Sequence, residues 1–216
     1  MRETTNLTGM VLKATPTGES DRRLVILTRE RGKITAFARG AKRPGNQLMA
    51  VSRPFVFGQF RLYEGRDAYN LQSAEIQNYF AEISGDVEAA CYGSYFLEFA
   101  DYYSREGIDG TELLLLLYQS LRALLKPALP NRLVQLVFEL RIMVVNGEYT
   151  EKPPRPVSES AVYAWEYIIA SSIESLYTFI LKEEVQKELE ICVSINKKRF
   201  VDREFHSLEI LHMMDF

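Results

Sequence analysis

The sequence contains few of the residues that usually carry metal binding and acid–base catalysis. Among 216 residues there are two cysteines and two histidines. Cys91 and Cys192 lie far apart and form no CxxC pair, so neither a disulfide framework nor a cysteine-based zinc site is expected. Both are interpreted as buried small apolar residues. His206 is expected to take a capping or core-edge position rather than to act as a base.

Long apolar runs and catalytic motifs are also missing. No apolar run reaches the roughly 18 residues that a membrane span needs, and the start "MRETTNLTGM" has no apolar core of a signal peptide. A soluble, cytoplasmic protein without membrane contact is therefore predicted. GxSxG, HExxH and DxDG spacings are absent, and "GAKRPG" lacks the GxxxxGK[ST] spacing of a nucleotide-hydrolysing loop. No catalytic residue is predicted, and the chain is not expected to be an enzyme.

Charge is divided unevenly along the chain. The formal net charge is −3, but residues 1–80 carry +6 and residues 81–216 carry −9. Ten cations and three acids fall within residues 13–53. A basic half joined to an acidic half indicates that the first half meets a polyanion, while the second maintains solubility or meets a different partner.

The hydrophobic pattern changes near residue 80, which predicts an α+β protein of two domains. The first part contains five short β-rich runs that end at turn residues, as in a small barrel or sandwich, with a brief helix at 47–52. Beyond Gly85 the apolar residues recur at three- and four-residue intervals, as in an all-α helical bundle. The expected strands are 9–15, 22–28, 33–41, 54–65 and 68–76, and the expected helices are 86–105, 111–126, 131–147, 159–171 and 182–205.

Local signals set some of the helix ends. Asn131 and Ser158 are expected N-caps, and Gly107 and Gly147 are expected stops. The proline-rich stretch 149–160, "YTEKPPRPVSES", cannot be helical throughout and is expected to be an exposed loop or strap across the bundle.

The third expected strand carries a basic face. If residues 33–40 form a strand, Lys33, Thr35, Phe37 and Arg39 point to one side, and small apolar residues point to the other. Cations follow a phosphate backbone while an aromatic ring stacks on a base. A solvated sheet face without a ligand is the alternative. The candidate nucleic-acid-binding residues are Arg22, Arg23, Arg29, Arg31, Lys33, Phe37, Arg39, Lys42 and Arg43.

Residues 9–44, "GMVLKATPTGESDRRLVILTRERGKITAFARGAKRP", strongly resemble the N-terminal oligonucleotide-binding (OB-fold) barrel of the RecO family of DNA repair proteins. The resemblance continues through "PFVFGQFRLYEGRDAYNLQSAEIQNYF", "YFLEFAD", "FELRIMVVNGEY" and "DREFHSLEIL", so it covers nearly the whole chain. It implies a five-stranded OB-fold domain at 1–80 and a helical domain at 81–216.

The resemblance also implies a function. Members of the family bind single- and double-stranded DNA, anneal complementary strands, and with RecR help load RecA onto DNA coated by single-strand-binding protein, whose acidic C-terminal tail they recognise. A cytoplasmic, nucleoid-associated location follows. Many members carry a four-cysteine zinc module where this chain has residues 149–160, without cysteine or histidine. No zinc or other cofactor is therefore expected.

A second function class remains open at this point. The barrel could be a protein-interaction scaffold without direct DNA binding, with an incidental basic face. Arg132, Arg141 and Arg203 in the acidic half could pair with the carboxylates of an acidic tail, but ion pairs with nearby glutamates inside the domain are the favoured interpretation.

Overall fold

The computed structural model describes residues 4–214, which form two compact units. The barrel unit consists of the chain up to Ser84 together with Leu97–Leu114, and the helical unit consists of Gly85–Phe96 and the chain from Leu115 onward. The boundary predicted between residues 80 and 81 separates the strands from the long helices, whereas the barrel unit also includes parts of three helices that follow residue 80. The domain boundary itself stays a prediction.

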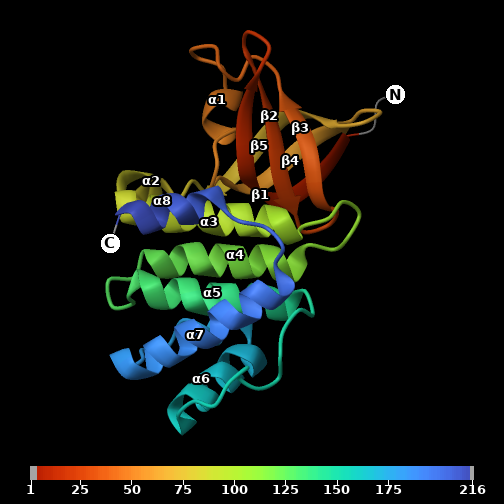
Figure 1. Ribbon diagram of the computed structural model, residues 1–216. Coiled ribbons are helices and arrows are strands. Elements are labelled where there is room, and N and C mark those ends of the chain that lie inside the picture. The colour runs from red at the N-terminus through yellow and green to blue at the C-terminus, as the bar shows by residue number, and fades with distance from the viewer. Residues whose placement is uncertain (1–3, 215–216) are drawn as a thin grey trace. The chain divides into compact units, whose positions relative to one another are not determined.

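The barrel unit contains the predicted five strands, closed into a barrel in the order β1-β2-β3-β5-β4 (Figure 1). Neighbouring strands are antiparallel, except for the short parallel pairing between β3 and β5 that completes the closure. The predicted brief helix is α1, Leu48–Val51. The strands are β1 Thr4–Thr17, β2 Asp21–Thr28, β3 Gly32–Ala38, β4 Phe57–Glu64 and β5 Tyr69–Asn78.

Barrel closure lengthens β1 beyond the apolar run at residues 9–15. Its first half, Thr4–Met10, pairs with β4, and its second half, Gly9–Thr17, pairs with β2. Gly9 lies opposite Gly58 where the two pairings meet, and a Cβ at either position would clash with a backbone carbonyl oxygen. Glycine therefore allows the close backbone approach at this corner of the barrel.

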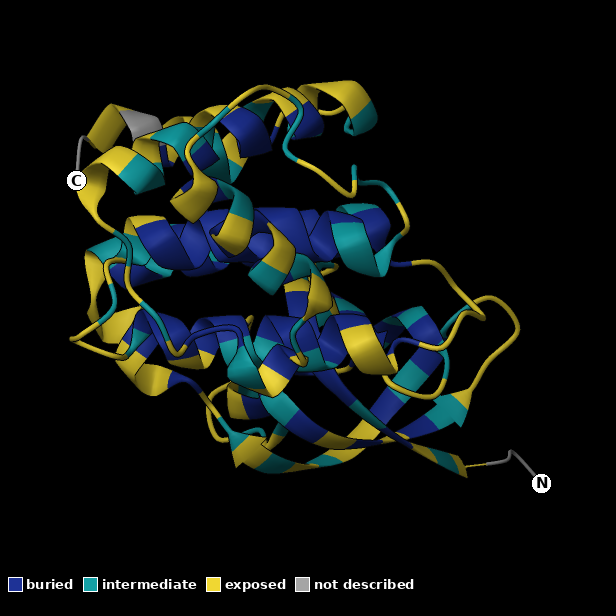
Figure 2. Ribbon diagram, turned by 90° about the horizontal axis from the view of Figure 1, so that it is seen from below, coloured by how far each residue is buried: buried dark blue, intermediate teal, exposed yellow. Residues whose placement is uncertain are grey.

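Alternating burial along the strands fills the barrel interior (Figure 2). Leu24 and Ile26 of β2 and Ile34 and Ala36 of β3 belong to one apolar cluster inside the barrel. Each fully buried leucine or isoleucine side chain stabilises the fold by about 1.5–3 kcal/mol. The opposite positions of the same strands face outward and are available for function.

The five predicted helices are present, but the last one is shorter than predicted. Helix α7 ends at Phe200, because Val201 takes an extended conformation, and a separate helix, α8, begins at His206. Between them the buried ring of Phe205 packs edge-on against Tyr95, at 5.5 Å between ring centroids. The helices are α2 Ala81–Gly85, α3 Val87–Tyr103, α4 Thr111–Leu124, α5 Asn131–Val145, α6 Glu159–Ala170, α7 Glu183–Phe200 and α8 His206–Met214, with a 3₁₀ turn, η1, at Ile173–Ser175.

The two predicted N-caps, Asn131 and Ser158, have different outcomes. Ser158 is the N-cap of α6 and accepts a hydrogen bond from the Ala161 amide, as predicted. The prediction for Asn131 was wrong, because Pro130 occupies the cap position and α5 begins at Asn131. Pro130 is extended, with a ψ of 130°, and makes no side-chain cap hydrogen bond.

Helix α5 is the centre of the helical unit, and every residue from Leu133 to Met143 is buried. It packs against α6 and α7, which also contact each other. After α5, Gly147 takes a positive φ of 73°, and the Glu148 amide donates to the Met143 carbonyl oxygen, which ends the helix as predicted. The proline-rich segment that follows is irregular and is attached by a 3.0 Å hydrogen bond from Trp165 Nε1 to the Thr150 carbonyl oxygen.

The two cysteines differ in environment. Cys192 is buried in the helical unit, as predicted, and burial raises the pKa of its thiol. Cys91 is only half-buried, so the expectation of a buried position was wrong for it. None of the helices in the described part of the chain combines the length and apolar character needed to cross a membrane.

Candidate nucleic-acid interface

The outer face of β3 has the predicted alternation. Lys33, Thr35 and Phe37 are half-buried and point outward, while Ile34, Ala36 and Ala38 are buried inside the barrel. Arg39 continues the outward series beyond the strand and is exposed.

Strand pairing places Phe37 between cations. Arg23 on β2 is the register partner of Phe37, and on the other side Phe37 pairs with Asn70 of β5. The Arg39 Nε atom donates to Asn70 Oδ1 at 3.4 Å, so the Arg39 side chain lies beside the same row. The exposed guanidinium of Arg23 and that of Arg39 therefore flank a partly exposed aromatic ring. We call Arg23, Phe37, Arg39 and Asn70 the outer row.

Two hollows lie along this outer surface of the barrel. The first, of about 400 Å³, is lined by Lys13, Arg23 and Lys33 on the strands and by the β4–β5 hairpin, Glu64–Tyr69. The second, of about 730 Å³, is lined by Arg39 and Asn70 among others. Residues Glu64–Arg66 of the hairpin line both hollows. The surface is thus an open groove divided by a hairpin.

Acidic side chains reach the first hollow as well. Its lining includes Glu64, Asp67, Asp101 and Glu106. Lys33 is half-buried, with 32% of its side chain exposed, because its Nζ binds the Asp101 carboxylate at 3.0 Å and the Asp101 carbonyl oxygen at 2.7 Å. Lys33 is therefore a paired cation and not a freely exposed one.

Arg22 does not contribute to the outer row. Because neighbouring residues of a strand point to opposite faces, Arg22 lies on the side of the buried Ala38. Its guanidinium donates to the Met49 carbonyl oxygen at 3.0 Å and to Ser52 Oγ at 3.0 Å, so it connects β2 to the end of α1.

Arg29 and Arg31 lie at the turn between β2 and β3 and are also engaged. Arg29 pairs with Glu30 at 3.1 Å, and Arg31 pairs with Glu64 at 3.1 Å. The Tyr69 hydroxyl at 2.6 Å and the Glu64 carboxylate raise the pKa of the Arg31 guanidinium. A rise of about 3.3 Å per residue puts these two arginines roughly 20 Å from the opposite end of the strands.

Lys42 and Arg43 lie at that opposite end, in the loop after β3. The loop consists of tight turns in which Gly40 and Gly45 have φ values of 67° and 78°, and both cations are exposed. The nine predicted residues therefore do not form one patch. Arg23, Phe37, Arg39, Lys42 and Arg43 occupy one end of the outer surface. By contrast, Arg29, Arg31 and Lys33 form ion pairs, and Arg22 is bound to Met49 and Ser52.

Sequence reasoning missed two cations of this surface. Lys13 of β1 lies across from Val25, whose other neighbour is Thr35, so it belongs to the row next to Phe37. Arg66 is exposed at the tip of the β4–β5 hairpin. Period-two alternation in the first strand could have indicated Lys13, but Arg66 sits in a turn whose position depends on barrel closure. Within residues 4–214, Lys13, Arg23, Arg39, Lys42, Arg43 and Arg66 form no ion pair.

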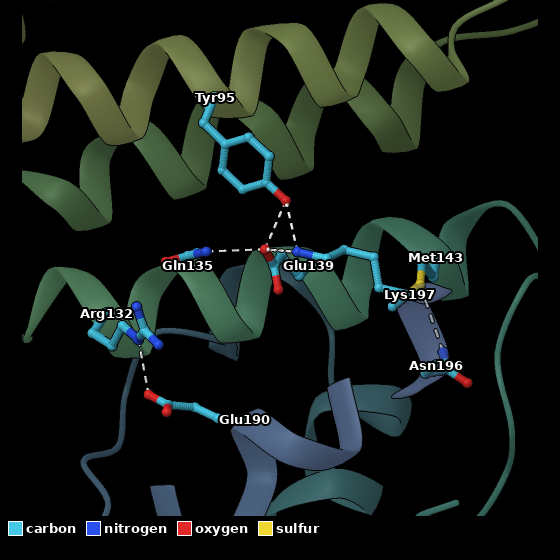
Figure 3. A network of polar contacts seen from close by, with 8 residues as sticks. All are labelled: Tyr95, Arg132, Gln135, Glu139, Met143, Glu190, Asn196 and Lys197. Atoms are coloured by element: carbon cyan, nitrogen blue, oxygen red, sulfur yellow. Dashed lines mark hydrogen bonds and ion pairs between the residues drawn. The ribbon is translucent and has the colours of Figure 1, made fainter. Parts of the chain in front are cut away.

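The helical unit contains a buried polar network (Figure 3). The Glu139 carboxylate, 4% exposed, accepts hydrogen bonds from Tyr95 Oη at 2.6 Å, Gln135 Nε2 at 3.0 Å and Lys197 Nζ at 2.7 Å. The network joins α3, α5 and α7 within this unit. Its polar atoms are used for packing, and it offers no open site.

The three arginines considered for an acidic tail have different environments. Arg132 binds Glu190 at 2.9 Å, and this hydrogen bond raises the pKa of the Arg132 guanidinium, which confirms the internal ion pair for this residue. Arg141 is buried, and it donates to the carbonyl oxygens of Ile168 and Ile169 in the last turn of α6. Arg203 is exposed before α8.

The residues present do not fit a zinc module. Across residues 4–214, no group of three or more His, Cys, Asp and Glu side chains is arranged to hold a metal ion. The segment 149–160 contains no cysteine or histidine, which are the usual zinc ligands of structural sites.

Comparisons with known proteins match both parts of the chain. Residues 1–80 match the family model "Recombination protein O N terminal", and residues 84–151 match "Recombination protein O C terminal". The chain is 26% identical to "DNA repair protein RecO" of Acetivibrio thermocellus over 96% of both chains. It is 34% identical to that of Alkaliphilus metalliredigens over 64% of this chain and 56% of the relative. It is 36% identical to that of Heliobacterium modesticaldum over 62% of this chain and 48% of the relative, so these two matches span about half the length of each relative.

Proposed function

Because the chain belongs to the RecO family of DNA repair and recombination proteins, we propose that it binds single- and double-stranded DNA and anneals complementary strands. The family consists of recombination mediators rather than enzymes. Annealing requires that two polyanions be neutralised and held without sequence readout, and no proton transfer is needed.

The observation that carries this proposal is the outer row of the barrel. Arg23 and Arg39 flank Phe37 on an open surface, and Asn70 adds a polar amide beside them. Guanidinium groups replace phosphate counterions, and stacking on an aromatic ring contributes about 1–3 kcal/mol per base. Lys42 and Arg43 extend the cationic surface into the neighbouring loop.

The groove should bind weakly and depend strongly on salt, since acids share it. Two of the four acids in the first hollow, Glu64 and Asp101, are already paired with Arg31 and Lys33. The remaining cations still exceed the remaining acids there, which supports attraction of a strand without tight retention. Such binding is suited to a protein that must release the annealed duplex.

We further propose the partners and conditions that the family implies. The proposed partner is RecR, with which the protein helps to load RecA onto DNA coated by single-strand-binding protein. The protein also recognises the acidic tail of that coating protein. Its proposed location is cytoplasmic and nucleoid-associated. In this proposal the protein works without zinc, because residues 149–160 supply no cysteine or histidine to bind it.

The test separates charge from stacking at the outer row. We expect fluorescence anisotropy with a labelled single strand to show tenfold or greater weakening for Arg23→Ala with Arg39→Ala. The slope of log K against log salt should fall by about 1.4, because each single-strand phosphate contact contributes about 0.7. Phe37→Leu should weaken binding about fivefold or more with an unchanged slope, because it removes stacking and no charge.

The control removes two exposed cations elsewhere. Lys187→Ala with Lys198→Ala changes the net charge by the same amount on α7 and should leave DNA binding within twofold of wild type. Annealing of complementary oligonucleotides should follow the binding results. Absence of DNA binding by the wild-type protein at 50 mM salt would instead favour the protein-interaction scaffold.

A further inference from the structure

A second surface, in the helical unit, is built differently from the DNA groove. A groove of about 570 Å³ lies between α6 and the segment Thr178–Leu181, which runs beside that helix (Figure 1). Tyr163 and Ile180 both line it and are 71% and 70% exposed. Most protein surfaces carry exposed apolar side chains singly and far apart. Two large ones that are this exposed on the same groove are unusual.

The groove has a fixed aromatic wall. Tyr167 lies between the other two rings, stacked near Tyr163 at 6.4 Å between centroids and edge-on to Phe179 at 5.3 Å. The Tyr167 hydroxyl is held by the Ser175 carbonyl oxygen at 3.0 Å. Because the wall is held by packing and hydrogen bonding, a bound side chain would meet a preformed apolar surface.

The charge around the groove is acidic. Glu159 lines it, and between residues 159 and 184 there are five glutamates and one cation, Lys182. Of the other four, which do not line the groove, Glu166, Glu174 and Glu184 are exposed, and Glu183 is exposed but paired with Lys187. An anionic rim attracts cations and repels both DNA and an acidic peptide tail.

We propose that this groove binds a short segment of a partner protein that carries two apolar or aromatic side chains flanked by lysine or arginine. The apolar side chains would lie against Tyr163, Tyr167 and Ile180, and the flanking cations would pair with Glu159 and its acidic neighbours. This surface is separate from the outer row, and its chemistry is the opposite of what an acidic tail requires. The inference is independent of the DNA-binding proposal.

The experiment uses the full-length protein and three fluorescein-labelled twelve-residue peptides. The first contains one Trp and one Leu among Lys and Ser residues, the second has every Lys replaced by Glu, and the third has Trp and Leu replaced by Ser. We expect anisotropy titration to show at least tenfold tighter binding of the first peptide than of either other peptide. Binding of the first should weaken with rising salt because the rim is charged.

Matched variants locate the binding. Tyr163→Ser and Ile180→Ser should each weaken binding of the first peptide at least fivefold. The control is Ile191→Ser, which removes an isoleucine that is 45% exposed on α7 outside the groove. It should leave binding within twofold of wild type. Glu159→Gln should weaken it two- to threefold at low salt, and Glu151→Gln in the exposed loop should not.

Some outcomes would overturn the inference. Equal or tighter binding of the glutamate peptide would show that the rim does not select cations. Equal effects of Ile180→Ser and Ile191→Ser would show that the peptide does not occupy this groove. Single-strand DNA binding by Tyr163→Ser should equal that of wild type, so failure here is distinguishable from failure of the DNA proposal.

Discussion

The Lys33 ammonium group has two competing partners, the Asp101 carboxylate that it contacts and a DNA phosphate that could enter the same hollow. The pair is partly exposed, with 32% and 26% of the two side chains accessible, so its contribution to stability is at most about 1 kcal/mol. Asp101 therefore neutralises a cation of the groove without being needed for folding. This gives a direct way to change DNA affinity at one residue.

Asp101→Asn should strengthen single-strand binding two- to fivefold at 50 mM salt, because Lys33 is released from its ion pair. The salt slope should steepen by up to about 0.7, the value of one added phosphate contact. Anisotropy titrations over a salt series measure both quantities.

Glu106→Gln is the matched control, since Glu106 lines the same hollow but does not pair with Lys33. It removes the same charge and should strengthen binding less than Asp101→Asn does. If the two variants behave alike, general electrostatics rather than release of Lys33 explains the gain.

At the scale of elements, the β2–β3 turn connects the barrel to the end of α3. The Lys33 amide donates to the Arg105 carbonyl oxygen at 3.0 Å, and the Gly110 amide donates to the Arg29 carbonyl oxygen at 2.9 Å. Gly32 at this turn has a φ of 61°, and a Cβ there would overlap the carbonyl oxygens of Arg105 and Ile108. Glycine is thus required both for conformation and for space.

Gly32→Ala should lower the free energy of unfolding by about 2–5 kcal/mol. The left-handed conformation costs about 1–2 kcal/mol and steric overlap a further 1–3. Gly18 has a φ of 54°, and no atom lies within 4 Å of a Cβ added there. Gly18→Ala should therefore lose only the free energy that the left-handed conformation costs. Urea denaturation of both variants checks the difference, and equal losses would mean that the contact with Arg105 and Ile108 is relieved easily.

The network around Glu139 connects three helices and depends on one lysine. Lys197→Met leaves a buried carboxylate without its counter-ion, and removing one partner of a buried pair costs about 3–5 kcal/mol. Because Tyr95 and Gln135 still donate to it, the loss of unfolding free energy should be near the lower limit of that range.

Two further variants make this prediction specific. Glu139→Gln combined with Lys197→Met should recover much of the stability, because no unpaired charge remains. Lys187→Met removes the lysine of an exposed pair with Glu183 on the same helix and should have no measurable effect. A loss for Lys187→Met as large as for Lys197→Met would show that packing of α7, and not the buried charge, is responsible.

At the scale of the whole molecule, the two oppositely charged parts of the sequence carry different surfaces. The part with net +6 contains the outer row, and the part with net −9 contains the aromatic groove. A net charge of −3 hides this separation. Each part therefore suits a ligand of the opposite charge to its own.

Removal of metal should not change the stability of the whole molecule. Incubation with EDTA should leave the melting temperature within about 1 °C, and elemental analysis should find less than 0.1 zinc per chain, because the segment 149–160 contains no cysteine or histidine. One zinc per chain, with a fall in melting temperature after chelation, would contradict this prediction.

The sequence by itself determined the order of elements and the alternation within them. Period-two burial in β3 and helical periodicity beyond Gly85 are local properties, so they were predictable, and the resemblance identified the family. Helix α8 and the first half of β1 were missed, because they depend on packing of Phe205 and on barrel closure.

Only the tertiary structure decided which cations are available. Arg22 bonds to Met49 and Lys33 bonds to Asp101, and both partners are far away in the sequence. The aromatic groove likewise exists only because α6 packs beside Thr178–Leu181.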